Sequence, residues 1–104
     1  MFDETLIVEA GRRLLEAAPP ETKVILFGSH ARGEAGKYSD LDFLVVEPSV
    51  EDAIDESVRL RRTLRGLLLA ADIIVVSEDE AEAWRDVHGT VIHAALSEGR
   101  PLAA

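Results

Sequence analysis

The stretch that decides the fold, residues 24–46, reads VILFGSHARGEAGKYSDLDFLVV. Two short apolar runs, Val24–Phe27 and Leu41–Val46, predict strands that are buried on both faces. The segment between them contains three glycines, and the first of these, Gly28, directly follows the first run. We therefore expect a loop over residues 28–36 that connects two core strands.

Helical patterns lie on both sides of this stretch. A first helix is expected over Asp3–Ala17, because Pro19-Pro20 prevents it from continuing. After the second strand, Ser49 with Asp52 resembles a helix start, and the second helix should run to about Leu69. Its apolar residues are expected to face the sheet: Ile54, Val58, Leu64, Leu67 and Leu68.

The rest of the chain predicts a third strand and a last helix. Asp72 leads into the strand Ile73–Val76, and Ser77 can cap a short acidic turn. The last helix should occupy Thr90–Ser97 and end at Gly99. Strands that alternate with helices predict an α/β fold with a small sheet covered on one or both faces. The length of 104 residues predicts a single domain, 1–104.

Composition limits the classes of partner. The formal net charge is -9, so direct binding of a nucleic acid by the chain alone is disfavoured. The apolar runs are too short to cross a bilayer, and no membrane partner is expected. Cysteine is absent, and Met1–Leu6 lacks the pattern of a secretion signal, so we expect a cytoplasmic protein.

The residues around the loop are suited to phosphate and metal binding. Backbone amides at Gly28 and Ser29 can approach phosphate oxygens closely, and the serine hydroxyl adds one more donor. Asp40 and Asp42 are two residues apart, so on a strand both carboxylates project from one face. Such a pair is stable chiefly when a cation neutralises it, and Mg²⁺ is the expected ion.

Asp72, at the start of another strand, is a candidate third carboxylate. As a ligand it would bring a second ion into the site, and two ions can stabilise the attacking and leaving oxygens of an in-line displacement. The alternative interpretation is that an aspartate here simply ends the preceding turn.

The order Gly28-Ser29, ten intervening residues and Asp40-Leu41-Asp42 resembles the signature of the polymerase-beta-like nucleotidyltransferase superfamily. The small size resembles its minimal nucleotidyltransferase family. The resemblance implies a small mixed β-sheet flanked by α-helices. It also implies that Gly28 and Ser29 bind the triphosphate of ATP, with Arg32 steadying the loop or touching phosphate. Asp40, Asp42 and Asp72 would serve as metal ligands and catalytic carboxylates.

The resemblance also implies a partner. Minimal domains of this family are typically encoded beside a helical HEPN-type RNase toxin, which they neutralise as antitoxins, in characterised cases by placing AMP on a tyrosine. The expected function is Mg²⁺-dependent transfer of AMP from ATP to a hydroxyl of such a toxin. Two alternatives stay open: a non-catalytic binding module that occludes its partner, and a transferase that modifies a small molecule such as an aminoglycoside.

Other polar residues receive a plainer interpretation. His30 and Tyr38 are expected to be loop residues without a catalytic task, and His88 and His93 to be surface or packing residues. The arginines of the second helix are expected to form a solvated face, with docking of an acidic partner helix as the less favoured alternative: Arg59, Arg61, Arg62 and Arg65. Self-association is left open.

Overall fold

The computed structural model describes residues 4–28, 41–67 and 69–102. Within these ranges, four strands form one sheet in the order β3-β2-β1-β4, accompanied by four helices. The elements are, in chain order, α1 (Glu4–Ala17), β1 (Lys23–Phe27), β2 (Leu41–Glu47), α3 (Ala53–Arg62), β3 (Ala71–Ser77), α4 (Glu78–Trp84), α5 (Val91–Glu98) and β4 (Arg100–Leu102).

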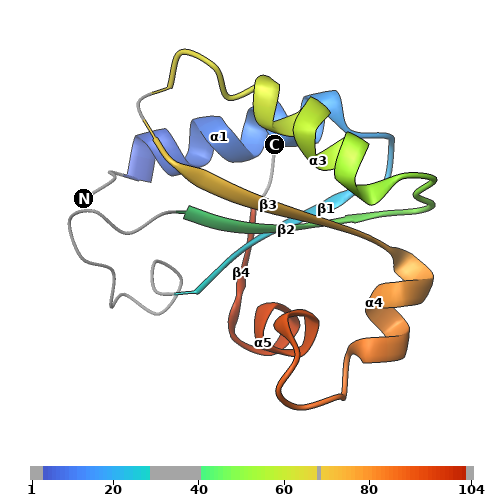
Figure 1. Ribbon diagram of the computed structural model, residues 1–104. Helices are drawn as coiled ribbons and strands as arrows, with labels where there is room; N and C mark the ends of the chain where they lie inside the picture. The colour runs from blue at the N-terminus through green and yellow to red at the C-terminus, as the bar shows by residue number, and fades with distance from the viewer. Residues whose placement is uncertain (1–3, 29–40, 68, 103–104) are drawn as a thin grey trace.

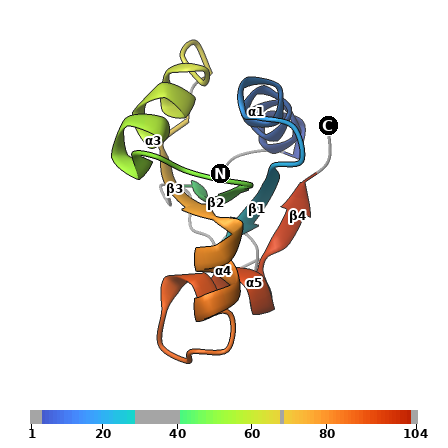
Figure 2. The ribbon, with the colours of Figure 1, turned by 90° about the vertical axis from the view of Figure 1, so that its right-hand side faces the viewer.

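The sheet lies between two layers of helices. Helices α1 and α3 lie over one face, and α4 and α5 lie against the other (Figures 1 and 2). Strand β2 pairs antiparallel with β1 and parallel with β3, and β4 adds to the free edge of β1. The predicted α/β class with a small mixed sheet is confirmed, and both faces are covered. None of the described helices is long and apolar enough to span a membrane.

Alternation along the strands divides the core into two clusters. Alternate residues of β2, Leu41, Phe43 and Val45, pack with α1 and α3, whereas Leu44 and Val46 pack with α4 and α5. All five of these side chains are 5% exposed or less. Strand β2 is therefore buried on both faces, as the continuous apolar run predicts. The larger cluster, beneath α1 and α3, contains Phe43 at its centre.

Helix α3 differs from the sequence prediction. It starts at Ala53, with Asp52 as the N-cap accepting from the amides of Ile54 and Asp55, and it ends at Arg62, not at Leu69. The chain turns over residues 63–66, where Gly66 adopts a φ of +93°. A left-handed residue cannot continue a helix, which explains the early end.

The predicted inner face of this helix was partly wrong. Ile54 and Val58 are 76% and 44% exposed, and Leu60 is buried in their place. Leu64 is buried, as expected, but it lies in the turn after the helix, and Leu67 is partly buried. The side chain of Leu68 lies outside the described residues.

The C-terminal elements contain two further differences. Ser77 is an N-cap as predicted, but the segment after it is the seven-residue helix α4 and not a short turn. Helix α5 ends before Gly99 as predicted, and the next three residues form β4, which the sequence did not predict. Pro101 in so short a run argues against a strand, but proline is tolerated in an edge strand such as β4.

A carboxyl pair is buried at the far end of β2 from Asp42. Glu47 is 2% exposed and shares a hydrogen bond with Glu56 of α3. Burial, and then this hydrogen bond, raises the pKa of Glu47 to about 7. Arg59 donates to both Glu56 oxygens at 2.8 and 2.7 Å and, together with the Glu47 contact, lowers the pKa of Glu56 to about 2. The folded chain thus holds one extra proton, on Glu47, near pH 6.

We expect Glu47→Gln to stabilise the protein at pH 8. The folded chain keeps the Glu47 proton up to about pH 7, whereas an unfolded glutamate loses it near pH 4.5. The contribution of Glu47 to stability is therefore complete below pH 4.5 and is lost as the pH rises to 7. Glutamine keeps an uncharged donor toward Glu56. The free energy of unfolding of the variant should therefore exceed that of the wild type by roughly 1 to 3 kcal/mol at pH 8, and this difference should nearly vanish at pH 5. Urea unfolding of the variant and the wild type at pH 5 and pH 8 measures this difference. A difference of equal size at both pH values would contradict a protonated Glu47.

Phe43→Ala should destabilise the fold by about 3 to 5 kcal/mol, because it empties the largest fully buried side-chain volume at the centre of the sheet. Ile54→Ala is the control: this side chain is 76% exposed, and its loss should cost no more than about 0.5 kcal/mol. Urea unfolding of the two variants beside the wild type checks the expectation. A similar cost for both would show that Phe43 is not the centre of the core.

Candidate functional site

The in-register pairing of three strands positions two of the predicted carboxylates. Asp42 of β2 lies opposite Phe27 of β1 on one side and opposite Asp72 of β3 on the other. Paired residues point to the same face of a sheet, so the Asp42 and Asp72 side chains project together. Their face is the one that carries Leu44 and Val46, toward α4 and α5.

This part of the face is accessible. The cluster beneath α4 and α5 contains Val76 at the C-terminal end of β3, but Ile74 is 37% exposed and Asp72 is exposed. Asp42 is half-buried. Among the described elements, helices α4 and α5 therefore cover the other end of the strands and do not cover the two aspartates.

Gly28 leaves β1 beside the Asp42 carboxylate. Its φ is +80°, a left-handed conformation that favours glycine, and a Cβ at this position would lie 2.5 Å from Asp42 Oδ2. The backbone at the start of the predicted phosphate loop thus contacts one of the predicted metal ligands directly. The predicted place of Gly28 between strand and loop agrees with this geometry, although its binding of phosphate stays a prediction.

The other predicted site residues lie outside the described ranges. These are Ser29 and Arg32 of the phosphate loop and the carboxylate Asp40, together with His30 and Tyr38. Among the described residues, no cluster of three or more His, Cys, Asp or Glu could hold a metal ion, which leaves Asp42 and Asp72 as two carboxylates of the predicted three-member set.

The two described carboxylates are chemically suited to Mg²⁺. They offer hard oxygen ligands from adjacent strands, on a face open to a substrate that would complete the coordination. The close approach of Gly28 adds backbone to the same corner and leaves no room for a side chain beside Asp42.

The histidines are arranged as surface packing. The rings of His88 and His93 lie 4.2 Å apart between centroids, and His93 Nδ1 lies 2.8 Å from the carbonyl oxygen of Arg85. These contacts join the α4–α5 connection to α5, away from Asp42. They agree with the packing interpretation of both residues.

A group of arginines near the site was not predicted from the sequence as part of it. Arg61, Arg62 and Arg65 line a groove that also includes Asp72. The sequence shows several arginines close together in an acidic chain. It does not show where α3 ends or that these arginines lie beside the edge of β3.

The chain matches a known protein family and is similar to several solved structures. The family model described as Nucleotidyltransferase domain matches residues 8–95, which include both aspartates and the loop between β1 and β2. No protein of curated function matches the chain. A solved structure from Sulfolobus solfataricus, with the provisional description nucleotidyltransferase, is 30% identical, with 76% of this chain and 70% of that chain covered and a TM-score of 0.58.

Two more distant structures share the fold. One is the toxin–antitoxin MntA-HpeT with two aspartate-to-glutamate substitutions, at 20% identity and a TM-score of 0.64, covering 99% of this chain and 74% of that chain. The other is a toxin–antitoxin with AMP-PNP, at 19% identity and a TM-score of 0.58, with the same coverage. At these identities the likeness establishes the fold, which is the minimal polymerase-beta-like arrangement expected above.

Gly28→Ala should be more damaging than Gly66→Ala. Both glycines have positive φ, at +80° and +93°, so alanine costs each roughly 1 kcal/mol of backbone strain. A Cβ at Gly66 meets nothing within 4 Å, whereas at Gly28 it must displace the Asp42 carboxylate. We therefore expect an additional loss of about 1 to 2 kcal/mol for Gly28→Ala in urea unfolding, and weaker binding of Mg²⁺-ATP in calorimetry. Equal stability and equal nucleotide binding in the two variants would argue against the contact.

Proposed function

Because the chain belongs to the nucleotidyltransferase domain family, we propose that it transfers AMP from ATP to a hydroxyl group of a partner protein. The observation that carries this proposal is the register that sets Asp42 beside Asp72 on an open face of the sheet, with Gly28 against the Asp42 carboxylate. This site combines carboxylate oxygens with a backbone segment that leaves room for a ligand to approach closely. A metal-bound triphosphate requires both.

In the proposed reaction, the acceptor hydroxyl oxygen attacks the α-phosphorus of ATP. A new phosphorus–oxygen bond forms, the bond to the pyrophosphate oxygen breaks, and the hydroxyl proton leaves to a base or to solvent. Asp42 and Asp72, with Asp40 as the third predicted ligand, would hold Mg²⁺, which neutralises the charge that develops on the phosphate oxygens. The protein's own contribution is positioning, since transfer of this kind needs little covalent help from side chains.

The proposed roles of the site residues follow from their places. Gly28 and Ser29 are proposed to bind the triphosphate through backbone amides and the serine hydroxyl, with Arg32 supporting the loop. Asp72 lies on the edge strand, so it is the carboxylate nearest to an acceptor that arrives from outside the sheet. We therefore assign it to the acceptor side of the site, with Asp42 toward the nucleotide.

The proposed partner is a HEPN-type toxin, and the proposed biological role is that of an antitoxin. Support comes from the fold likeness to toxin–antitoxin structures over nearly the whole chain, one of them with AMP-PNP. Modification of a partner's hydroxyl would then be the means of neutralisation.

Asp42→Asn should lower the rate of nucleotide transfer at least about a hundred-fold, because the amide keeps the size of the carboxylate but not its charge toward Mg²⁺. The assay incubates the chain with [α-³²P]ATP, Mg²⁺ and the product of the neighbouring gene, and follows label on that protein. Asp86→Asn, at an exposed aspartate of the α4–α5 connection, is the control and should retain full activity.

Each outcome of this assay distinguishes between the proposed functions. Label on the partner that depends on Asp42 supports protein nucleotidylation. A complex that silences the partner equally well with wild type and Asp42→Asn, without label, would replace the proposal by a non-catalytic binding module. Transfer to an aminoglycoside, with none to the protein, would replace it by small-molecule modification.

A further inference from the structure

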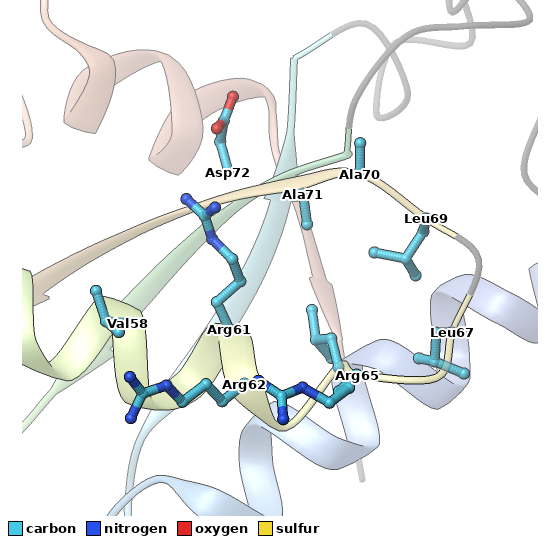
Figure 3. Close-up of a pocket in the computed structure, with 10 residues that line it drawn as sticks. Val58, Arg61, Arg62, Arg65, Leu67, Leu69, Ala70, Ala71 and Asp72 are labelled. Carbon is cyan, nitrogen blue, oxygen red and sulfur yellow. The ribbon is translucent and has the colours of Figure 1, made fainter.

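A groove of about 570 Å³ lies between the C-terminal end of α3 and strand β3 (Figure 3). Arg61, Arg62 and Arg65 line it, and Asp72 lies at its boundary. Its apolar lining comes from α3, the turn after it and the start of β3: Val58, Leu64, Leu67, Leu69, Ala70 and Ala71. The groove thus combines an apolar floor with a concentration of positive charge.

These three arginines differ from the other arginines of the described chain in forming no ion pair with a described acidic residue. Each of the other five forms an ion pair with a glutamate: Arg12, Arg13, Arg59, Arg85 and Arg100. The side chains of Arg61, Arg62 and Arg65 form no such pair with a described residue, although the chain carries 20 acidic residues. Three arginines without a described ion-pair partner thus line one groove of a protein with a net charge of -9.

The groove also runs beside an edge strand. Strand β3 pairs only with β2 in the described sheet, so its outer backbone edge is available to an additional extended segment. Val58, 44% exposed, lies on the α3 side of this edge and lines the groove. Apolar contacts and strand-edge hydrogen bonds are therefore available together with the arginines.

We infer that this groove docks an extended acidic segment of the protein that accepts the nucleotide. Carboxylates of that segment would pair with Arg61, Arg62 and Arg65, and its apolar residues would contact the floor. The inference rests on the proposed function, because it assigns the place where the protein acceptor is held. A nucleic acid is the less favoured occupant, since its phosphates extend well beyond three arginines onto a surface of like charge.

The position of the groove explains how docking would serve the reaction. In Figure 3, the Arg61 side chain extends from α3 toward β3, and Asp72 projects from β3 on the side away from α3. A segment held by the arginines along the edge would therefore pass beside Asp72 as it leaves the groove. Docking here would deliver a hydroxyl to the acceptor side of the site and would lower the KM for the acceptor with little effect on ATP binding.

The test uses a fluorescein-labelled decapeptide of alternating glutamate and valine, whose binding is followed by fluorescence anisotropy. The wild type should bind it, and Arg61→Gln/Arg62→Gln/Arg65→Gln should bind at least about ten-fold more weakly. The control, Arg12→Gln/Arg85→Gln/Arg100→Gln, removes the same amount of charge from paired arginines and should stay within about two-fold of wild type. Circular dichroism of both variants verifies that they are folded.

The peptide assay requires no nucleotide transfer, so its result is separate from that of the labelled-ATP assay. Binding by the wild type that the groove variant loses and the control keeps supports the inference, even if no transfer is found. Absence of binding by the wild type, or an equal loss in both variants, would overturn it. Tighter, groove-dependent binding of a ten-nucleotide oligouridylate than of the peptide would overturn it in favour of a nucleic-acid site.

Discussion

The register of the parallel pair β2–β3 is the constraint on which the rest of the site depends. It places Asp42 opposite Asp72, and the antiparallel pairing with β1 brings Gly28 against the Asp42 carboxylate. A shift of one residue between β2 and β3 would move one aspartate to the face beneath α1 and α3. That face is closed by apolar side chains, and an unpaired carboxylate there would be costly, so core packing and site geometry enforce the same register.

The two faces of the sheet have different tasks. Helices α1 and α3 cover one face, where Phe43 is the largest of the fully buried side chains. Helices α4 and α5 cover the opposite face only toward the C-terminal ends of β2 and β3. The described fold therefore supports the aspartates from below with a packed core and does not cover them with a described helix.

Charge is distributed unevenly over this small acidic chain. Five of the eight described arginines are paired with glutamates, and Arg59 also lies beside the Glu47–Glu56 pair. Arg61 and Arg62 are the last residues of α3, and Arg65 lies in the turn after it, which contains Gly66. All three line the groove beside β3.

The sequence by itself determined the two central strands, the α/β class and the pairing of a glycine turn with aspartates, because continuous apolar runs and fixed strand alternation are local properties. It did not determine the end of α3, the exposure of Ile54 and Val58, or the existence of β4. These depend on which surface each segment meets: α3 presents Leu60 to the sheet, and Pro101 is acceptable only at an edge. Only the tertiary structure decided that three arginines and Asp72 line one groove. It also placed Asp72 in register with Asp42, because residues 30 positions apart become neighbours only through strand pairing.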